Sequence, residues 1–143
     1  MLSFNIKTGS KGDYLTIHVL DTPKSAGARY DDWVDVGVEI KAGGFIARYK
    51  AQFFVNEILI LQADLERLYN NLSGSLKFQT LEGQLEFEIT GNGRGNFETQ
   101  GEAWDKSGGQ SRLCFSFETF DQTYIPQMLK ELAEIKSQLI WKP

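Results

Sequence analysis

The sequence predicts a single α+β domain built on a meandering antiparallel β-sheet of about eight strands, with one inserted helix and one C-terminal helix. Apolar and polar residues alternate in about eight short segments, which is the period of strands with one buried face. The apolar period lengthens to three and four residues over about 56–72 and about 124–139, which is typical of amphipathic helices. No internal repeat or linker divides the 143 residues, so we expect one domain, 1–143.

Four strands are expected before the first helix. Alternation begins at Leu2 and resumes over 14–20, and a loop of about a dozen residues, 21–32, follows. The next two strands form a hairpin around Gly43 and Gly44, because glycine takes the positive φ that a tight turn requires. Each strand has one apolar face, made by Phe4, Ile6, Leu15, Ile17, Val19, Val34, Val36, Val38, Ile40, Phe45, Ala47, Tyr49, Ala51 and Phe53.

The inserted helix has clear signals at both ends. Asn56 is the expected N-cap, and Glu57 suits the positive end of the helix macrodipole. Gly74 is expected to end the helix, in the usual position of a C-terminal glycine. The apolar stripe between these signals consists of Ile58, Leu61, Leu65, Leu68 and Leu72.

Four further strands and the last helix complete the prediction. Gly101 interrupts the strand expected over 97–104, where a glycine can mark a β-bulge. Pro126 belongs in the first turn of the last helix, which makes Thr123 a better N-cap than Asp121. The other inward positions are Leu76, Phe78, Leu85, Phe87, Ile89, Leu113, Phe115 and Phe117. We expect both helices to pack on one sheet face and to leave the other partly open.

Composition and charge restrict the possible functions. The formal net charge is −4 and the pI is about 5.0, so we expect no direct contact with nucleic acid, which requires a basic surface. Cys114 is the one cysteine, which fits a reducing compartment. The N-terminal residues 1–12 lack the apolar core of a secretory signal, and the longest aliphatic run, 58–61, is too short to cross a membrane. These features predict a cytoplasmic protein.

No catalytic or metal-binding constellation is visible. His18 is the one histidine and alternates with apolar neighbours on a predicted strand, which favours a structural or surface role. One histidine and one cysteine fall short of a zinc ligand set, and no acidic run matches a calcium loop. Glu86 and Glu88 share one strand face and could form an acid/base pair, but alternation with apolar residues explains them as a solvated face. We therefore expect no enzyme activity and no cofactor.

Acidic residues gather in two places. Asp31, Asp32 and Asp35 surround Trp33. Six acids and one base lie between Glu82 and Asp105. Such patches attract a basic partner, although many acidic patches only keep a protein soluble.

Four segments taken together resemble the WapI-type family of bacterial immunity proteins. They are Trp33-Val34 leading to Gly44-Phe45, the helix 56–71 closed by Leu72-Ser73-Gly74, the acidic hairpin 85–95, and the phenylalanine-rich strand that leads into Asp121-Gln122-Thr123-Tyr124-Ile125. The resemblance covers about Trp33 to Ile135. It implies a protein that binds a co-encoded secreted or contact-dependent toxin inside the producing cell; in the namesake system that toxin is a nuclease acting on transfer RNA.

The leading hypothesis is therefore a binding protein whose partner is a protein toxin, with a basic nuclease domain as one candidate. The residues expected at the interface are Asp31, Asp32, Trp33, Asp35, Glu86, Glu88, Glu98 and Glu102. Complementary charge would speed the encounter, and buried aromatic residues would slow release. The alternative is a small-ligand-binding or scaffold protein that uses a curved antiparallel sheet. The oligomeric state is left open.

Overall fold

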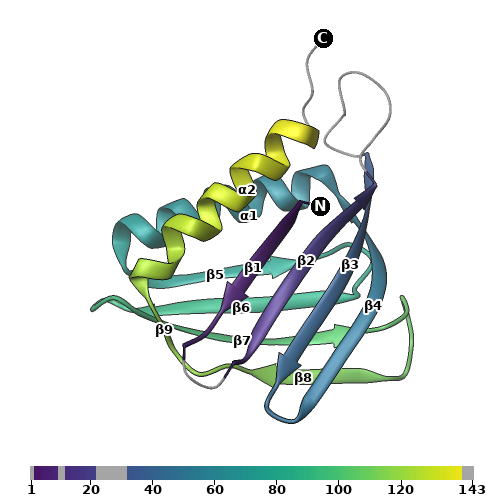
Figure 1. The fold of residues 1–143 in the computed structure, drawn as a ribbon, viewed down its shortest axis with the longest axis horizontal. Helices are drawn as coiled ribbons and strands as arrows, with labels where there is room; N and C mark the ends of the chain where they lie inside the picture. Colours follow the sequence, from purple (N-terminus) through teal and green to yellow (C-terminus); the bar gives the residue numbers. More distant parts are fainter. Residues whose placement is uncertain (1, 10–11, 22–31, 140–143) are drawn as a thin grey trace.

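The computed structural model describes residues 2–9, 12–21 and 32–139 and has the predicted α+β class (Figure 1). The first half contains β1 (Ser3–Lys7), β2 (Tyr14–Asp21), β3 (Trp33–Ala42), β4 (Phe45–Phe54) and α1 (Val55–Asn71). The second half contains β5 (Ser73–Gln79), β6 (Leu85–Asn92), β7 (Asn96–Trp104), β8 (Arg112–Ser116), β9 (Phe120–Asp121), a 3-10 turn (Gln122–Tyr124) and α2 (Ile125–Leu139). All of the described strand pairs are antiparallel.

The strands belong to two sheets rather than to one continuous meander. The first sheet has the order β1-β2-β3-β4, and the second has the order β5-β6-β7-β8 with β9 also paired to β7. The two sheets cross at a steep angle, as Figure 1 shows. The first half of the chain thus runs through four antiparallel strands into a helix, and the second half runs through five. The order of elements repeats although the sequence shows no repeat.

The two sheets bury their apolar faces in one shared core. Alternation along the strands turns Ile17, Val36 and Phe53 of the first sheet inward, and Phe87 and Phe97 of the second sheet do the same. The predicted inner faces are confirmed, except that Phe45 lies at the β3–β4 hairpin with 71% of its surface exposed. The opposite, outer face of each sheet carries mostly polar side chains.

The helices lie beside the edge strands of the two sheets. The sequence predicted both of them on one face of a single sheet. α1 lies against β5, and α2 lies against α1 and β1 (Figure 1). Glu131 of α2 accepts hydrogen bonds from the backbone N–H and the side-chain amide of Asn5, both at 3.0 Å. Arg67 of α1 donates to the carbonyl oxygen of Ser75 at 3.1 Å. Each helix therefore bonds to a backbone group on the edge strand of the sheet formed by the other half of the chain.

The predicted limits of α1 were each displaced by one or more residues. The N-cap is Phe54 rather than Asn56, because the Glu57 carboxylate reaches back to the Phe54 backbone N–H at 2.7 Å. The helix ends at Asn71, and Leu72, with φ of 61°, takes the left-handed conformation expected further on at Gly74. The Leu72 carbonyl then accepts a hydrogen bond from Gly93 at 2.9 Å, which holds this end of the helix against the second sheet.

The start of α2 and the role of Gly101 also differ from prediction. Asp121, and not Thr123, is the cap: its side chain accepts from the Thr123 N–H at 2.9 Å and begins a 3-10 turn that precedes α2. Pro126 is then the second residue of α2, where it is tolerated. The pairing of β6 with β7 runs through Gly101 without a bulge; the register shift of the described strands lies between Val19 and Asp21.

Candidate functional site

The outer face of the second sheet carries the four glutamates that the sequence singled out. Glu86 and Glu88 alternate with the buried Leu85, Phe87 and Ile89, so both carboxylates point outward from β6. On β7, Glu102 lies directly opposite Glu86, and Glu98 lies opposite Thr90, two register positions beyond Glu88. The structure therefore brings Glu86, Glu88, Glu98 and Glu102 together on one surface, here called the acidic face.

No ion pair in the described part of the chain neutralises the acidic face. Glu86 accepts a hydrogen bond from the Gln79 amide at 3.3 Å, and the Cys114 thiol lies 3.6 Å from a Glu102 oxygen. Lys77 is opposite Glu88 across the β5–β6 pair, beyond the distance of a salt bridge. Four carboxylates without a bound cation make a surface that favours a positively charged partner.

The acidic face is hollowed at its centre. Lys77, Glu88, Gln100, Glu102 and Cys114 are among the residues that line a depression of about 340 Å³ over β6, β7 and β8. Its floor includes the backbone at Gly101, where a Cβ atom would stand 2.4 Å from the Glu86 carbonyl and 2.7 Å from the Phe115 ring. Glycine is therefore required here by close packing on the inner side, not by a bulge.

The second predicted cluster lies on the other sheet. Trp33 and Asp35 point outward from β3, and Trp33 is 41% exposed with its ring stacked on Phe54 at a centroid distance of 4.0 Å. Asp35 accepts a hydrogen bond from Gln52 at 2.8 Å. Asp32 is only half-buried just before β3, and Asp31 lies outside the described residues. Because the sheets pack through their inner faces, this cluster and the acidic face point away from the shared core on different sides.

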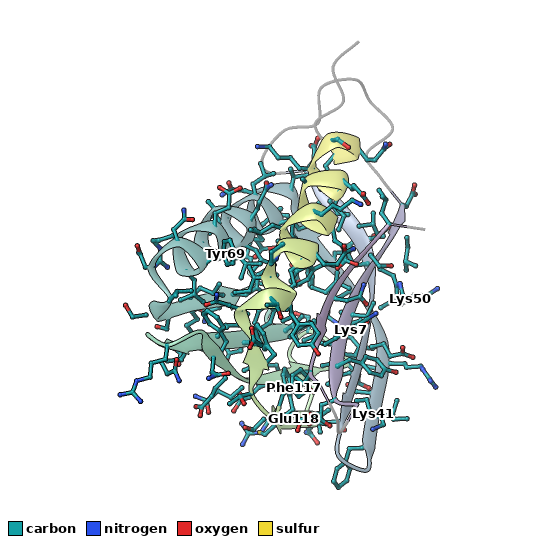
Figure 2. The ribbon with its side chains drawn as sticks, turned by 60° about the vertical axis from the view of Figure 1, so that its left-hand side comes forward. Lys7, Lys41, Lys50, Tyr69, Phe117 and Glu118 are labelled. Atoms are coloured by element: carbon teal, nitrogen blue, oxygen red, sulfur yellow. The ribbon has the colours of Figure 1, made fainter. Side chains whose placement is uncertain are left out.

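The outer face of the first sheet has mixed charge. Figure 2 labels Lys7, Lys41 and Lys50 on this side of the molecule. Glu39 forms an ion pair with Arg48 and accepts a hydrogen bond from the Tyr14 hydroxyl at 3.1 Å. The hydrogen bond from Arg48 lowers the pKa of Glu39. Desolvation by burial raises the pKa of Tyr14, and the neighbouring Glu39 carboxylate raises it further. The carboxylate of Glu39 is thus already satisfied within the chain, unlike those of the acidic face.

The potential catalytic groups are on different surfaces. The His18 imidazole is 2.7 Å from the Ser3 hydroxyl on the outer face of the first sheet, and Cys114 is exposed on the second sheet. Among the described residues there is no group of three or more His, Cys, Asp or Glu side chains placed to hold a metal ion. Neither described helix has the length and apolar character needed to cross a membrane.

Sequence reasoning missed two exposed features. The β3–β4 hairpin presents Phe45 and Ile46, which are 71% and 54% exposed, and the buried Asp13 holds its turn through a 2.9 Å bond from the Gly43 N–H. The glycines of this turn signalled the hairpin, but nothing in the pattern showed that it would extend beyond the core. The position of Cys114 beside Glu102 depends on the pairing of β7 with β8, which the sequence does not specify.

Comparison with known proteins gives one family and one similar fold. The sequence model described as the immunity protein WapI-like family matches residues 4–139. No curated protein sequence gives a significant match. Among solved structures, Trypanosoma bruciei MRP1/MRP2 aligns with 94% of this chain and 83% of its own, with a TM-score of 0.53 and 12% sequence identity. At that identity the similarity concerns the fold alone.

Proposed function

The chain belongs to the WapI-like immunity protein family, and on that premise we propose that it neutralises a protein toxin by binding it directly through the acidic face. The match over residues 4–139 includes nearly every described element of both halves. A toxin-immunity role follows from the family. The particular toxin, the contact surface and the cytoplasm of the producing cell as the place of action are our proposals.

The observation that carries the proposal is the pairing of Glu86 with Glu102. Like charges directly opposite each other on neighbouring strands destabilise a sheet, and here neither carboxylate forms an ion pair with a described residue. A fold gains nothing from this arrangement by itself. A partner that places lysine or arginine side chains against the two carboxylates would relieve the repulsion and gain charge-assisted hydrogen bonds.

A nuclease domain is the toxin class that fits this surface best. Nuclease domains must bind phosphate and therefore present basic surfaces. A protein with an acidic face can occupy such a surface and exclude nucleic acid from it, and opposite charge speeds the encounter. The hollow over β6, β7 and β8 would receive a projecting basic side chain.

Trp33 and Asp35, with Asp32 just before β3, form a second candidate contact on the other outer face. We rank it below the acidic face, because Asp35 is already hydrogen-bonded to Gln52 and Lys50 adds positive charge beside it. A partner that bound both faces at once would have to reach around the molecule.

The ligand-binding alternative receives less support from the fold. The inner faces of both sheets are filled by phenylalanine, leucine, isoleucine and valine side chains, so the described core is occupied by the protein itself. No cofactor-binding arrangement is evident in the described residues, and the proposal invokes none.

The proposal is tested with the toxin domain encoded beside this chain. Cells that express that domain should survive when they also express this protein, and the purified proteins should form a complex. The double variant Glu86→Gln/Glu102→Gln should remain folded and bind at least about tenfold more weakly, because each lost charged contact is worth roughly 1.5–3 kcal/mol. The matched control Glu66→Gln/Glu134→Gln removes two exposed acids from the helices and should bind normally. Equal weakening by both double variants would show that only net charge matters.

A further inference from the structure

Three of the four sheet edges have at least one backbone group that is bonded to a side chain from another part of the fold, and the fourth has none among the described residues. Glu131 accepts from the Asn5 N–H of β1, and Arg67 donates to the Ser75 carbonyl of β5. On the β4 edge, Gln84 donates to the Lys50 carbonyl at 3.2 Å and Glu57 accepts from the Phe54 N–H at 2.7 Å. β8 is the remaining edge, and beyond its pairing with β7 it has no backbone hydrogen bond to any described residue.

The register shows which backbone groups of β8 face outward. Phe117 donates to the Thr99 carbonyl at 2.9 Å, so these two residues form a hydrogen-bonded pair, and such pairs alternate along an antiparallel ladder. Leu113 and Phe115 therefore bond to β7. The N–H and C=O groups of Arg112, Cys114 and Ser116 point away from β7 instead, and all three residues are exposed.

We propose that the free edge of β8 accepts an extended strand of the toxin, which pairs with Arg112, Cys114 and Ser116 and continues the second sheet. This inference rests on the proposed function and names the part of the partner that is bound. Only a polypeptide backbone supplies alternating N–H and C=O groups at strand spacing, so this site recognises a protein and not a nucleic acid or a lipid.

The surroundings of β8 define the sequence pattern of the bound strand. On the outer side an added strand adjoins Arg112, Cys114 and Ser116, and beyond Cys114 lie Glu102 and the hollow of the acidic face, which favour a long basic side chain opposite Cys114. On the inner side the added strand adjoins Leu113, which is half-buried and packs against the core. An apolar side chain of the added strand is favoured beside Leu113. The expected occupant is a segment of about five to seven residues that alternates basic and apolar side chains.

A second copy of this chain is a poorer occupant of the same edge. Antiparallel pairing of two β8 strands about their central residue would place Cys114 opposite Cys114. It would also bring the Glu102 carboxylates of both copies towards one another and join two acidic faces into a single surface. A basic strand is attracted to the acidic face, whereas a second copy places another acidic face beside it.

Proline substitution tests the edge directly. The N–H groups of Cys114 and Ser116 are not used within the sheet, so Cys114→Pro and Ser116→Pro should remain folded, as proline is tolerated on edge strands. Each should weaken binding of the adjacent-gene toxin domain by roughly 10- to 100-fold, because one buried partner group loses its donor and the added ring blocks close approach. Cys114→Ser and Ser116→Ala keep the N–H and should bind like the wild-type chain.

Amide hydrogen exchange supplies a second measurement that needs no mutation. Toxin binding should slow exchange at Arg112, Cys114 and Ser116, whereas Leu113 and Phe115 are already protected by β7 in the free protein. Unchanged exchange at Cys114 and Ser116 in a formed complex would overturn the inference, even if the proline variants failed to fold.

The outcomes separate this inference from the proposed function. If the wild-type chain protects cells and folded proline variants bind equally well, strand addition is wrong and the proposed function stands. If the wild-type chain neither protects cells nor binds, both fall. A homodimer of the free chain that Ser116→Pro dissociates would assign the edge to a second copy, and the inference would then be wrong.

Discussion

Glu86 and Glu102 occupy directly opposite positions on β6 and β7, with no ion pair to either carboxylate from any described residue. Cross-strand pairs of like charge reduce sheet stability, so this position sacrifices stability in the free protein. Glu102→Gln should therefore raise the free energy of unfolding by about 0.2–1 kcal/mol at low salt, as measured by urea denaturation. The gain should shrink at high salt, where the repulsion is screened. A destabilised Glu102→Gln variant would show that this carboxylate contributes to the fold.

Glu131 joins the C-terminal helix to the first strand of the chain. Its two oxygens accept from the Asn5 backbone N–H and from the Asn5 side-chain amide, each at 3.0 Å. Glu131→Ala should lower the free energy of unfolding by roughly 1–3 kcal/mol, because the backbone donor loses its partner. Exchange of the Asn5 amide should also become faster. Ala133→Ser, at an exposed site on the same helix, should have little effect and serves as the control.

Glu57 should make stability depend on pH. Its carboxylate accepts from the N–H groups of Phe54 and Leu81, but desolvation by burial outweighs these bonds and raises its pKa in the folded protein. The folded state then holds this proton more tightly than the unfolded state does. The resulting contribution is fully present below the unfolded pKa and is lost as the pH rises through the folded pKa.

Glu57→Gln should therefore flatten the pH dependence of the free energy of unfolding in the weakly acidic range. The comparison requires urea denaturation of both proteins at several pH values. Parallel curves for the two proteins would mean that this carboxyl does not titrate differently on folding.

Gly101 should tolerate no side chain. A Cβ atom there would stand 2.4 Å from the Glu86 carbonyl oxygen, 2.7 Å from the Phe115 ring and 2.8 Å from the Phe87 Cβ atom. Gly101→Ala should lower the free energy of unfolding by about 1–3 kcal/mol, since the core must shift to make room. Gly44→Ala is the matched control, because a Cβ atom at that position would meet no atom within 4 Å beyond its chain neighbours. Equal melting temperatures for the two variants would contradict the packing described at Gly101.

The sequence predicted the strands and helices better than their assembly. Alternation identified the inner face of β6 from Leu85, Phe87 and Ile89, and with it the outward direction of Glu86 and Glu88. It could not show that the strands before and after α1 belong to different sheets, because that division depends on contacts between distant segments. The same limit applies to the candidate surface: Trp33 and Glu86 were both expected at the interface, yet they lie on different sheets.

Local errors at the helix ends and at Gly101 have a similar cause. Asn56 is a better N-cap by residue type, but the N-cap is Phe54, because the Glu57 carboxylate accepts from the Phe54 N–H. The same carboxylate accepts from the N–H of Leu81, in the second half of the chain, at 2.6 Å. A glycine in a strand fits a bulge or a close contact equally well until the neighbouring strands are known. In each case a partner distant in the sequence decides between two local interpretations.

The rate of association with the toxin domain encoded beside this chain tests the central claim most directly. The wild-type rate constant should be high at low ionic strength and fall steeply as salt is added. The variant in which Glu86, Glu88, Glu98 and Glu102 are all changed to glutamine should associate more slowly and with little dependence on salt. An unchanged rate constant and an unchanged salt dependence in that variant would contradict binding through the acidic face.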